Sequence, residues 1–132
     1  RTLAGTQTWL GGPVPGASLC APFDFVQKAP GVCQALAHAI VRALKWLRTA
    51  GPGDIVRAVP ESHWLGDRGL YLMSLAKVSE SFSIDGLMSE DGSRAALRVL
   101  TETDASVRAG HVNLGRAYTN AFALQAKERF KA

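Results

Sequence analysis

Two short motifs contain residues that could act as nucleophiles. Ser74 and Lys77 match the S-x-x-K spacing, which places a lysine one helical turn from a reactive serine. The companion S-D-N and K-T-G motifs are absent from the sequence. Residues 16–20 (GASLC) resemble a nucleophile elbow, but cysteine replaces the final glycine and no apolar strand precedes the turn. We interpret both motifs as chance matches and expect that the protein is not an enzyme.

The histidines and cysteines show no metal-binding pattern. His38, His63 and His111 lie on three different segments, without an HExxH motif or a carboxylate cluster. Cys20 and Cys33 form no CxxC pair. Because free cysteine is among the most buried residue types, we favour two buried, unpaired thiols over a disulfide. We therefore expect no metal and no cofactor.

The composition is that of one globular domain. The chain has 132 residues, of which 47% are hydrophobic and 20% are charged. The net charge of +4 suits anionic partners, but the basic residues are scattered and not interleaved with aromatic ones. We therefore expect no nucleic-acid binding. The chain begins at Arg1 and its first methionine is Met73, so we expect a piece of a longer protein.

A long amphipathic helix over residues 32–48 is expected to organise the fold. Its apolar residues recur at steps of three and four, which places them on one side of a helix. These residues are Val32, Leu36, Ile40, Ala43, Leu44 and Leu47. We expect this apolar stripe to face a part of the fold that the chain mostly lacks, and therefore to be exposed.

The remaining elements are expected to be one or two strands followed by helices. Residues 17–21 suit a strand buried on both faces, and Pro22 suits the start of a helix over residues 23–28. Further helices are expected over residues 54–59, from Asp67 to Phe82, and over 91–100 and 119–130, with a turn at Asp85 and Gly86. On the 91–100 helix, Ala96, Val99 and Leu100 are expected to face inward. Residues 101–113 are expected to be mostly connection.

Six segments, taken in order, resemble one protein family. They are RTLAGTQ-x₂-L-GGP (1–13), APFDF (21–25), QALAHAIVRALKWL (34–47), GDRGLYL (66–72), SIDGLMSEDG (83–92) and NLGRAYTNAF (113–122). The most specific match is DGLM at 85–88 paired with YTN at 118–120. The arrangement is similar to the C-terminal portion of periplasmic solute-binding proteins of ABC importers, of the nitrate/sulfonate/taurine/bicarbonate and thiamine-precursor type.

The resemblance implies an α/β fold, of which this chain would be a helix-rich fragment. The class is that of type II periplasmic binding proteins, whose two lobes close on a small ligand. Residues 1–12 would be the end of the second lobe, and residues 13–21 the hinge crossover and a strand. Residues 22–132 would be the helical C-terminal part of the first lobe.

The implied function is solute binding for an ABC-type importer, by a partial chain and for a small anionic solute. The partners would be that solute and an ABC permease at the membrane. The location would be periplasmic, or lipid-anchored on the outer side of the inner membrane. The family often has tyrosine after GGP, whereas this chain has Val14. If that tyrosine contacts the solute, the resemblance implies that the specificity differs here or that the site is lost.

The candidate ligand-binding residues are Trp9, Gly11, Gly12 and Pro13. Glycine lets backbone N–H groups approach an anion, and a glycine-proline crossover can also serve purely as a hinge. Trp9 could stack on a ligand or belong to the core. The alternative function is a small helical module for protein–protein interaction. In either case, exposed apolar faces predict self-association of the isolated chain or pairing of its strand with a neighbouring sheet edge.

Overall fold

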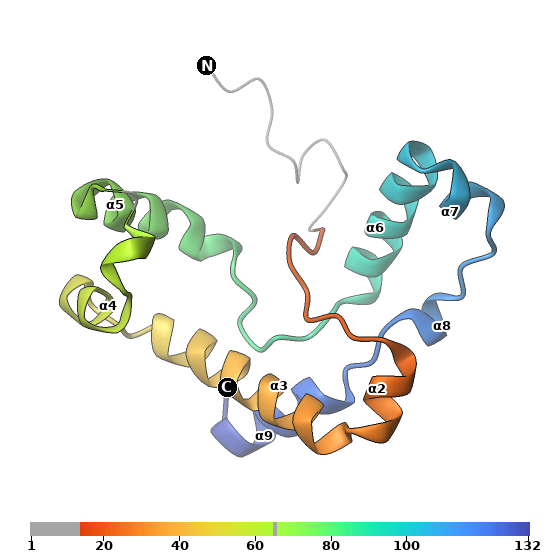
Figure 1. Ribbon diagram of the computed structural model, residues 1–132, viewed down its shortest axis with the longest axis horizontal. Helices are drawn as coiled ribbons and strands as arrows, with labels where there is room; N and C mark the ends of the chain where they lie inside the picture. The colour runs from red at the N-terminus through yellow and green to blue at the C-terminus, as the bar shows by residue number, and fades with distance from the viewer. Residues whose placement is uncertain (1–13, 65) are drawn as a thin grey trace. The chain divides into compact units, whose positions relative to one another are not determined.

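The computed structural model describes residues 14–64 and 66–132, and it is built from helices (Figure 1). The α-helices are α2 (Phe23–Lys28), α3 (Pro30–Leu47), α4 (Pro52–Ala58), α5 (Arg68–Val78), α6 (Glu90–Thr103), α7 (Ala105–Ala109), α8 (Leu114–Ala117) and α9 (Ala121–Phe130). Two 3₁₀ turns lie at Glu61–His63 and Ser79–Ser81. Within the described residues, no helix is both long enough and apolar enough to cross a membrane.

The expected α/β fold is wrong, because residues 14–64 and 66–132 contain no strand. The predicted strand at residues 17–21 is an exposed irregular segment, in which Leu19 is 55% exposed. A strand requires a neighbour that accepts its N–H groups and donates to its carbonyls. The prediction of a buried strand was therefore wrong, because the described residues supply neither a neighbouring strand nor a cover for this apolar segment.

The chain divides into two units, which are described separately below. The first contains Arg1–Cys33 and Leu87–Phe122, and the second contains Gln34–Gly86 and Ala123–Ala132. The predicted boundary between residues 12 and 13 lies outside the described part of the chain.

In the first unit, α6 is fixed by side-chain bonds at both ends. At its start, the Ser89 hydroxyl accepts a hydrogen bond from the Gly92 N–H at 3.0 Å. At its end, the Arg108 guanidinium of α7 donates to the carbonyls of Thr101 and Glu102, at 2.9 and 2.7 Å. These bonds turn α7 back against α6, so the prediction of a mere connection over 101–113 missed two short helices.

The buried side of α6 is displaced from the predicted one. Ala95 is 5% exposed and Ser93 is 6% exposed, whereas Leu100 is 50% exposed. The small residues near the start of the helix are therefore the ones that pack. Of the three residues predicted to face inward, Ala96 and Val99 are half-buried and only Leu100 is exposed.

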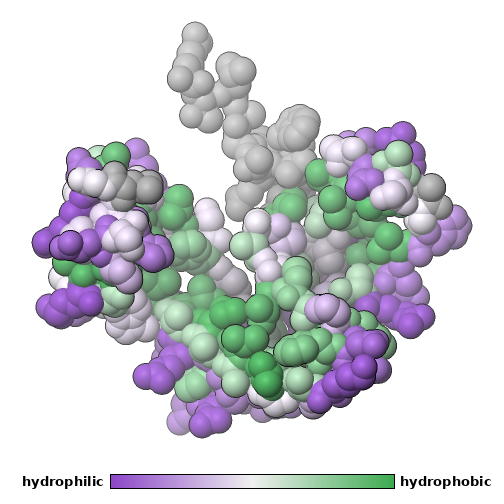
Figure 2. All heavy atoms as spheres, in the orientation of Figure 1, coloured by the Kyte–Doolittle hydropathy of each residue, from purple (hydrophilic) through white to green (hydrophobic). Residues whose placement is uncertain are grey.

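In the second unit, α3 also packs through its smaller residues. Val41 is 1% exposed and Ala37 is 9% exposed. The predicted stripe lies on a different side of the helix, and its members Val32, Leu36 and Ile40 are 50%, 44% and 42% exposed. Figure 2 shows hydrophobic side chains gathered over α3. Ala43 is also exposed, whereas Leu44 and Leu47 are half-buried, so the predicted exposure holds for four of the six residues of the stripe.

Helix α9 packs on α3 through three specific contacts. The Phe130 ring meets the His38 imidazole edge-on, with ring centres 5.5 Å apart. The Lys45 ammonium donates to the backbone carbonyl of Phe130 and, at 3.3 Å, to that of Lys131. Ala126 is fully buried, as the predicted spacing of apolar residues on this helix indicated.

Candidate functional site

The predicted ligand-binding residues Trp9, Gly11, Gly12 and Pro13 lie outside the described residues. The candidate site that can be built from the structure lies in the first unit and consists of residues 87–92 and 113–122, which belong to two of the segments that carry the family resemblance. A groove beside α6 and α8 lies next to them.

The two segments are joined by one asparagine side chain. The Asn120 carboxamide oxygen accepts from the Met88 N–H at 2.9 Å, and its amide nitrogen donates to the Met88 carbonyl at 2.9 Å. The two residues are 32 positions apart in sequence, and both are partly buried. A side chain that satisfies both backbone groups of one residue fixes that segment as a paired strand would. We call this pair of bonds the Asn120–Met88 junction.

The turn that leads into the junction is also determined by its sequence. The Ser83 hydroxyl accepts from the Gly86 N–H at 2.9 Å. Gly86 has φ of +75°, and a Cβ at this position would lie 3.1 Å from Cγ2 of Val41. Both observations require glycine here. The neighbouring Asp85 carboxylate pairs with the Lys127 ammonium at 2.8 Å, which ties the turn to α9.

The second segment begins and ends with capping side chains. The Asn113 carboxamide accepts from the Gly115 N–H at 3.0 Å and starts α8. The Thr119 hydroxyl accepts from the Ala121 N–H at 3.2 Å, immediately before α9. The polar residues of the family resemblance therefore act in this structure as turn and cap residues.

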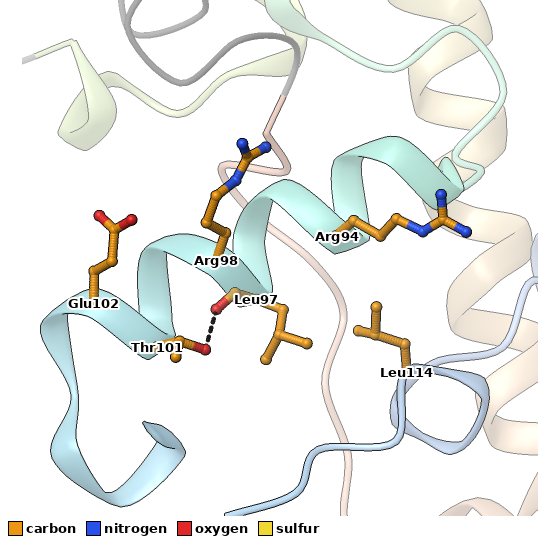
Figure 3. A pocket seen from close by; sticks show the side chains of 6 residues that line it. All are labelled: Arg94, Leu97, Arg98, Thr101, Glu102 and Leu114. Carbon is orange, nitrogen blue, oxygen red and sulfur yellow. Dashed lines mark hydrogen bonds between the residues drawn. The ribbon is translucent and has the colours of Figure 1, made fainter. Parts of the chain in front are cut away.

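A shallow groove of about 550 Å³ lies between α6 and α8. It continues into a hollow of about 370 Å³ along the outer turn of α6 (Figure 3). The two share Arg94, Leu97 and Leu114. Figure 3 shows Leu97 and Leu114 facing each other, which makes the floor apolar.

The charges around the groove balance. Arg94 pairs with Glu90 one turn earlier on α6, and both side chains are mostly exposed. Arg98 and Glu102 are also one turn apart, and Figure 3 shows them projecting on the side of α6 away from Leu114. Two guanidinium groups and two carboxylates give no net attraction for an anion. The groove therefore does not have the electrostatics of an anion site.

One carboxylate of the first unit, at the start of α7, has a shifted pKa. Asp104 is the N-cap of α7, and it accepts hydrogen bonds from the Ser106 hydroxyl at 2.7 Å and from the Ser106 N–H at 2.8 Å. These bonds favour the ionised form and lower the pKa of Asp104 below its usual value. The shift reflects helix capping.

The other chemically reactive residues are not brought together. Among the described residues, no group of three or more His, Cys, Asp or Glu side chains is placed to hold a metal ion. Cys33 is buried and Cys20 is exposed, so the prediction of burial holds for only one of the two. Both are free thiols, as predicted. Ser74 and Lys77 are exposed on α5.

Comparisons with known proteins gave one informative similarity. No protein-family model matches the chain, and no curated protein gave a significant match. A solved protein from Bordetella bronchiseptica does match. It is 38% identical to this chain, with a TM-score of 0.89. The alignment covers 96% of this chain and 40% of the Bordetella protein, so this chain spans well under half the length of its neighbour.

Proposed function

We propose that this chain is part of the solute-binding component of an ABC-type importer for a small anionic solute, located in the periplasm or anchored on the outer side of the inner membrane. The observation that carries the proposal is the Asn120–Met88 junction. The two motifs with the most specific family resemblance, DGLM and YTN, supply the two partners of the junction. A contact between them explains why the two motifs occur together.

Two further observations support the proposal. The exposed stripe of Val32, Leu36 and Ile40 is an apolar face of the kind that packs against other parts of a protein. The similar Bordetella protein is more than twice as long as this chain, so a fold of this kind exists within a larger molecule. In our proposal the stripe packs on further parts of a longer chain. The solute contacts remain those of Trp9, Gly11, Gly12 and Pro13.

Thermal shift of the full-length protein tests the proposal directly. Nitrate, bicarbonate and the sulfonate taurine carry anionic groups, and an aminopyrimidine is the non-anionic comparison. A solute present at 100 times its Kd should stabilise the folded state by about 2.7 kcal/mol and raise Tm. Replacing Trp9→Ala should abolish the shift, whereas the matched control Trp46→Ala should retain it. A full-length protein that responds to none of these solutes would contradict the proposal.

The reading frame upstream of Arg1 offers an independent test. The proposal requires a signal peptide or lipoprotein signal and a preceding ligand-binding portion. Translation that starts close to Arg1 would contradict it.

A second candidate function is a small helical module for protein–protein interaction. The exposed apolar residues of α3 and α5 favour it, since Leu70 and Met73 on α5 are 57% and 62% exposed. The two functions differ in the full-length protein. An interaction module would show no solute-dependent change in Tm, and its helices would bury these residues on a separate protein.

A further inference from the structure

The surface where α9 meets α3 carries a concentration of positive charge. We define the basic edge as five cationic residues of the second unit: Arg42, Lys45, Arg48, Arg129 and Lys131. All five are exposed.

Contacts to Phe130 place the residues of the two helices together. The Lys45 ammonium donates to the carbonyls of Phe130 and Lys131. The Arg129 guanidinium lies 5.8 Å from the centre of the Phe130 ring, and that ring contacts His38. Arg42 occupies the position between His38 and Lys45 on the same side of α3, because residues three and four apart are neighbours on a helix.

The charge of the basic edge is largely uncompensated. Within the described part of the chain, neither Arg42 nor Arg48 forms an ion pair. Helix α3 has no acidic residue and α9 has one, the exposed Glu128, while the Asp85 carboxylate is paired with Lys127. Five cations therefore face solvent with one exposed carboxylate beside them on α9. A surface of this kind attracts an anionic partner.

An exposed tryptophan accompanies these cations. Trp46 is 40% exposed and lies one helical turn from Arg42 on α3. Tryptophan combines an apolar ring with a polar N–H group and is enriched where proteins meet the lipid–water interface. Cationic residues with an adjacent tryptophan are the composition of segments that lie on anionic membranes.

We propose that the basic edge binds the headgroups of an anionic bilayer, with Arg42 and Arg48 supplying attraction and Trp46 entering the interface. Positive charge alone would be enough to bind an acidic protein. The exposed indole of Trp46 beside that charge favours a lipid surface instead. The surface belongs to a different part of the chain from the proposed solute contacts. Membrane binding and solute binding can therefore be tested independently, and a negative result for one does not contradict the other.

Vesicle flotation of the full-length protein tests this inference. Vesicles of phosphatidylcholine are compared with vesicles containing equal parts of phosphatidylcholine and phosphatidylglycerol. The protein should float only with the anionic vesicles, and less so as salt is raised, because screening weakens surface attraction. Equal binding to both vesicles, or binding to neither, would overturn the proposal.

A pair of charge-matched variants separates the basic edge from overall charge. Arg42→Glu with Arg48→Glu should weaken binding to anionic vesicles at least about 25-fold, at about fivefold for each basic residue lost from the surface. Arg98→Glu with Arg116→Glu changes the net charge equally at exposed positions of the first unit, and should retain binding. An equal loss in both variants would overturn the proposal.

Two further measurements complete the test. Trp46→Ala should weaken binding to anionic vesicles without changing its salt dependence, because an indole contributes no charge.

Immobilised polyglutamate serves as an acidic protein surface. Retention on polyglutamate together with no flotation on anionic vesicles would overturn the proposal in favour of an acidic protein partner. Circular dichroism of each variant verifies that the helices are retained.

Discussion

The segments around the Asn120–Met88 junction differ from the faces of α3 and α5 in how they are held. The junction segments are fixed by hydrogen bonds between named side chains and the backbone, as at Ser83, Ser89 and Asn120. The helix faces carry large apolar residues that remain exposed, such as Leu36 and Met73. These hydrogen bonds have both partners within the described residues, whereas the exposed apolar faces have no cover there.

The largest expected effect is at the turn before the junction. Gly86→Ala should destabilise the second unit by about 2–3 kcal/mol, because alanine is strained at positive φ and its Cβ would crowd Val41. Urea unfolding measures the change. Gly31→Ala, on α3 with no atom within 4 Å of the added Cβ, is the control and should be neutral or slightly stabilising. Equal loss in both variants would show that the turn is not specially constrained.

The junction itself should come next. Asn120→Ala leaves the Met88 N–H and carbonyl without their partner, and should lower the free energy of unfolding by about 1–3 kcal/mol. Asn113→Ala removes one capping bond and should lower it by about 1 kcal/mol or less. If the two variants lose the same free energy of unfolding, the Asn120–Met88 junction contributes no more stability than a single helix cap. That result would contradict the special role given to the junction here.

Substitutions in the exposed stripe of α3 should change self-association and leave stability nearly unchanged, unlike the substitutions at the junction. Leu36→Gln with Ile40→Gln should change stability by less than about 1 kcal/mol, because both residues are more than 40% exposed. The same change should reduce the predicted self-association of the isolated chain. Light scattering measures this, with Ala37 and Val41 left intact to preserve packing. A parent chain that is already a monodisperse monomer would contradict the predicted association.

The smallest effect should be a pH dependence at α7. The hydrogen bonds from Ser106 lower the folded-state pKa of Asp104, so its stabilising contribution is complete above the usual aspartate pKa. It is lost as the pH falls through the lowered value, when the capping carboxylate becomes protonated. The amide chemical shift of Ser106 should follow this titration. Asp104→Asn retains a capping oxygen but does not titrate, and should remove the pH dependence.

The sequence was most informative where a single residue determines its own backbone. Residues 23–28 were predicted as a helix and form α2 with the same bounds, and Asp67 caps α5 as expected, accepting from the Leu70 N–H at 2.9 Å. Gly86 forms the predicted turn with positive φ. Such features rest on φ preferences and on hydrogen bonds within a few residues, which periodicity and residue type reveal directly.

Sequence reasoning failed where the outcome depends on distant partners. The apolar run at residues 17–21 was predicted as a buried strand, yet a strand exists only if another strand pairs with it. On α3 and α6 the packed sides carry small residues such as Ala37 and Ala95, whereas the pattern had singled out larger ones. Apolar periodicity identifies the faces that can be buried, but not which of them finds a partner.

The discontinuity of the two units has a consequence for the order of folding. Each unit is assembled from two stretches, and the second is completed only by Ala123–Ala132. During synthesis, α3 therefore emerges about 80 residues before Phe130, whose backbone carbonyl accepts the hydrogen bond from Lys45. Neither unit can form as one contiguous block, and a truncation before residue 123 would remove an essential part of the second unit. The side of α3 that packs on α9 would then be uncovered in the nascent chain, and transiently exposed apolar surface of this kind favours aggregation.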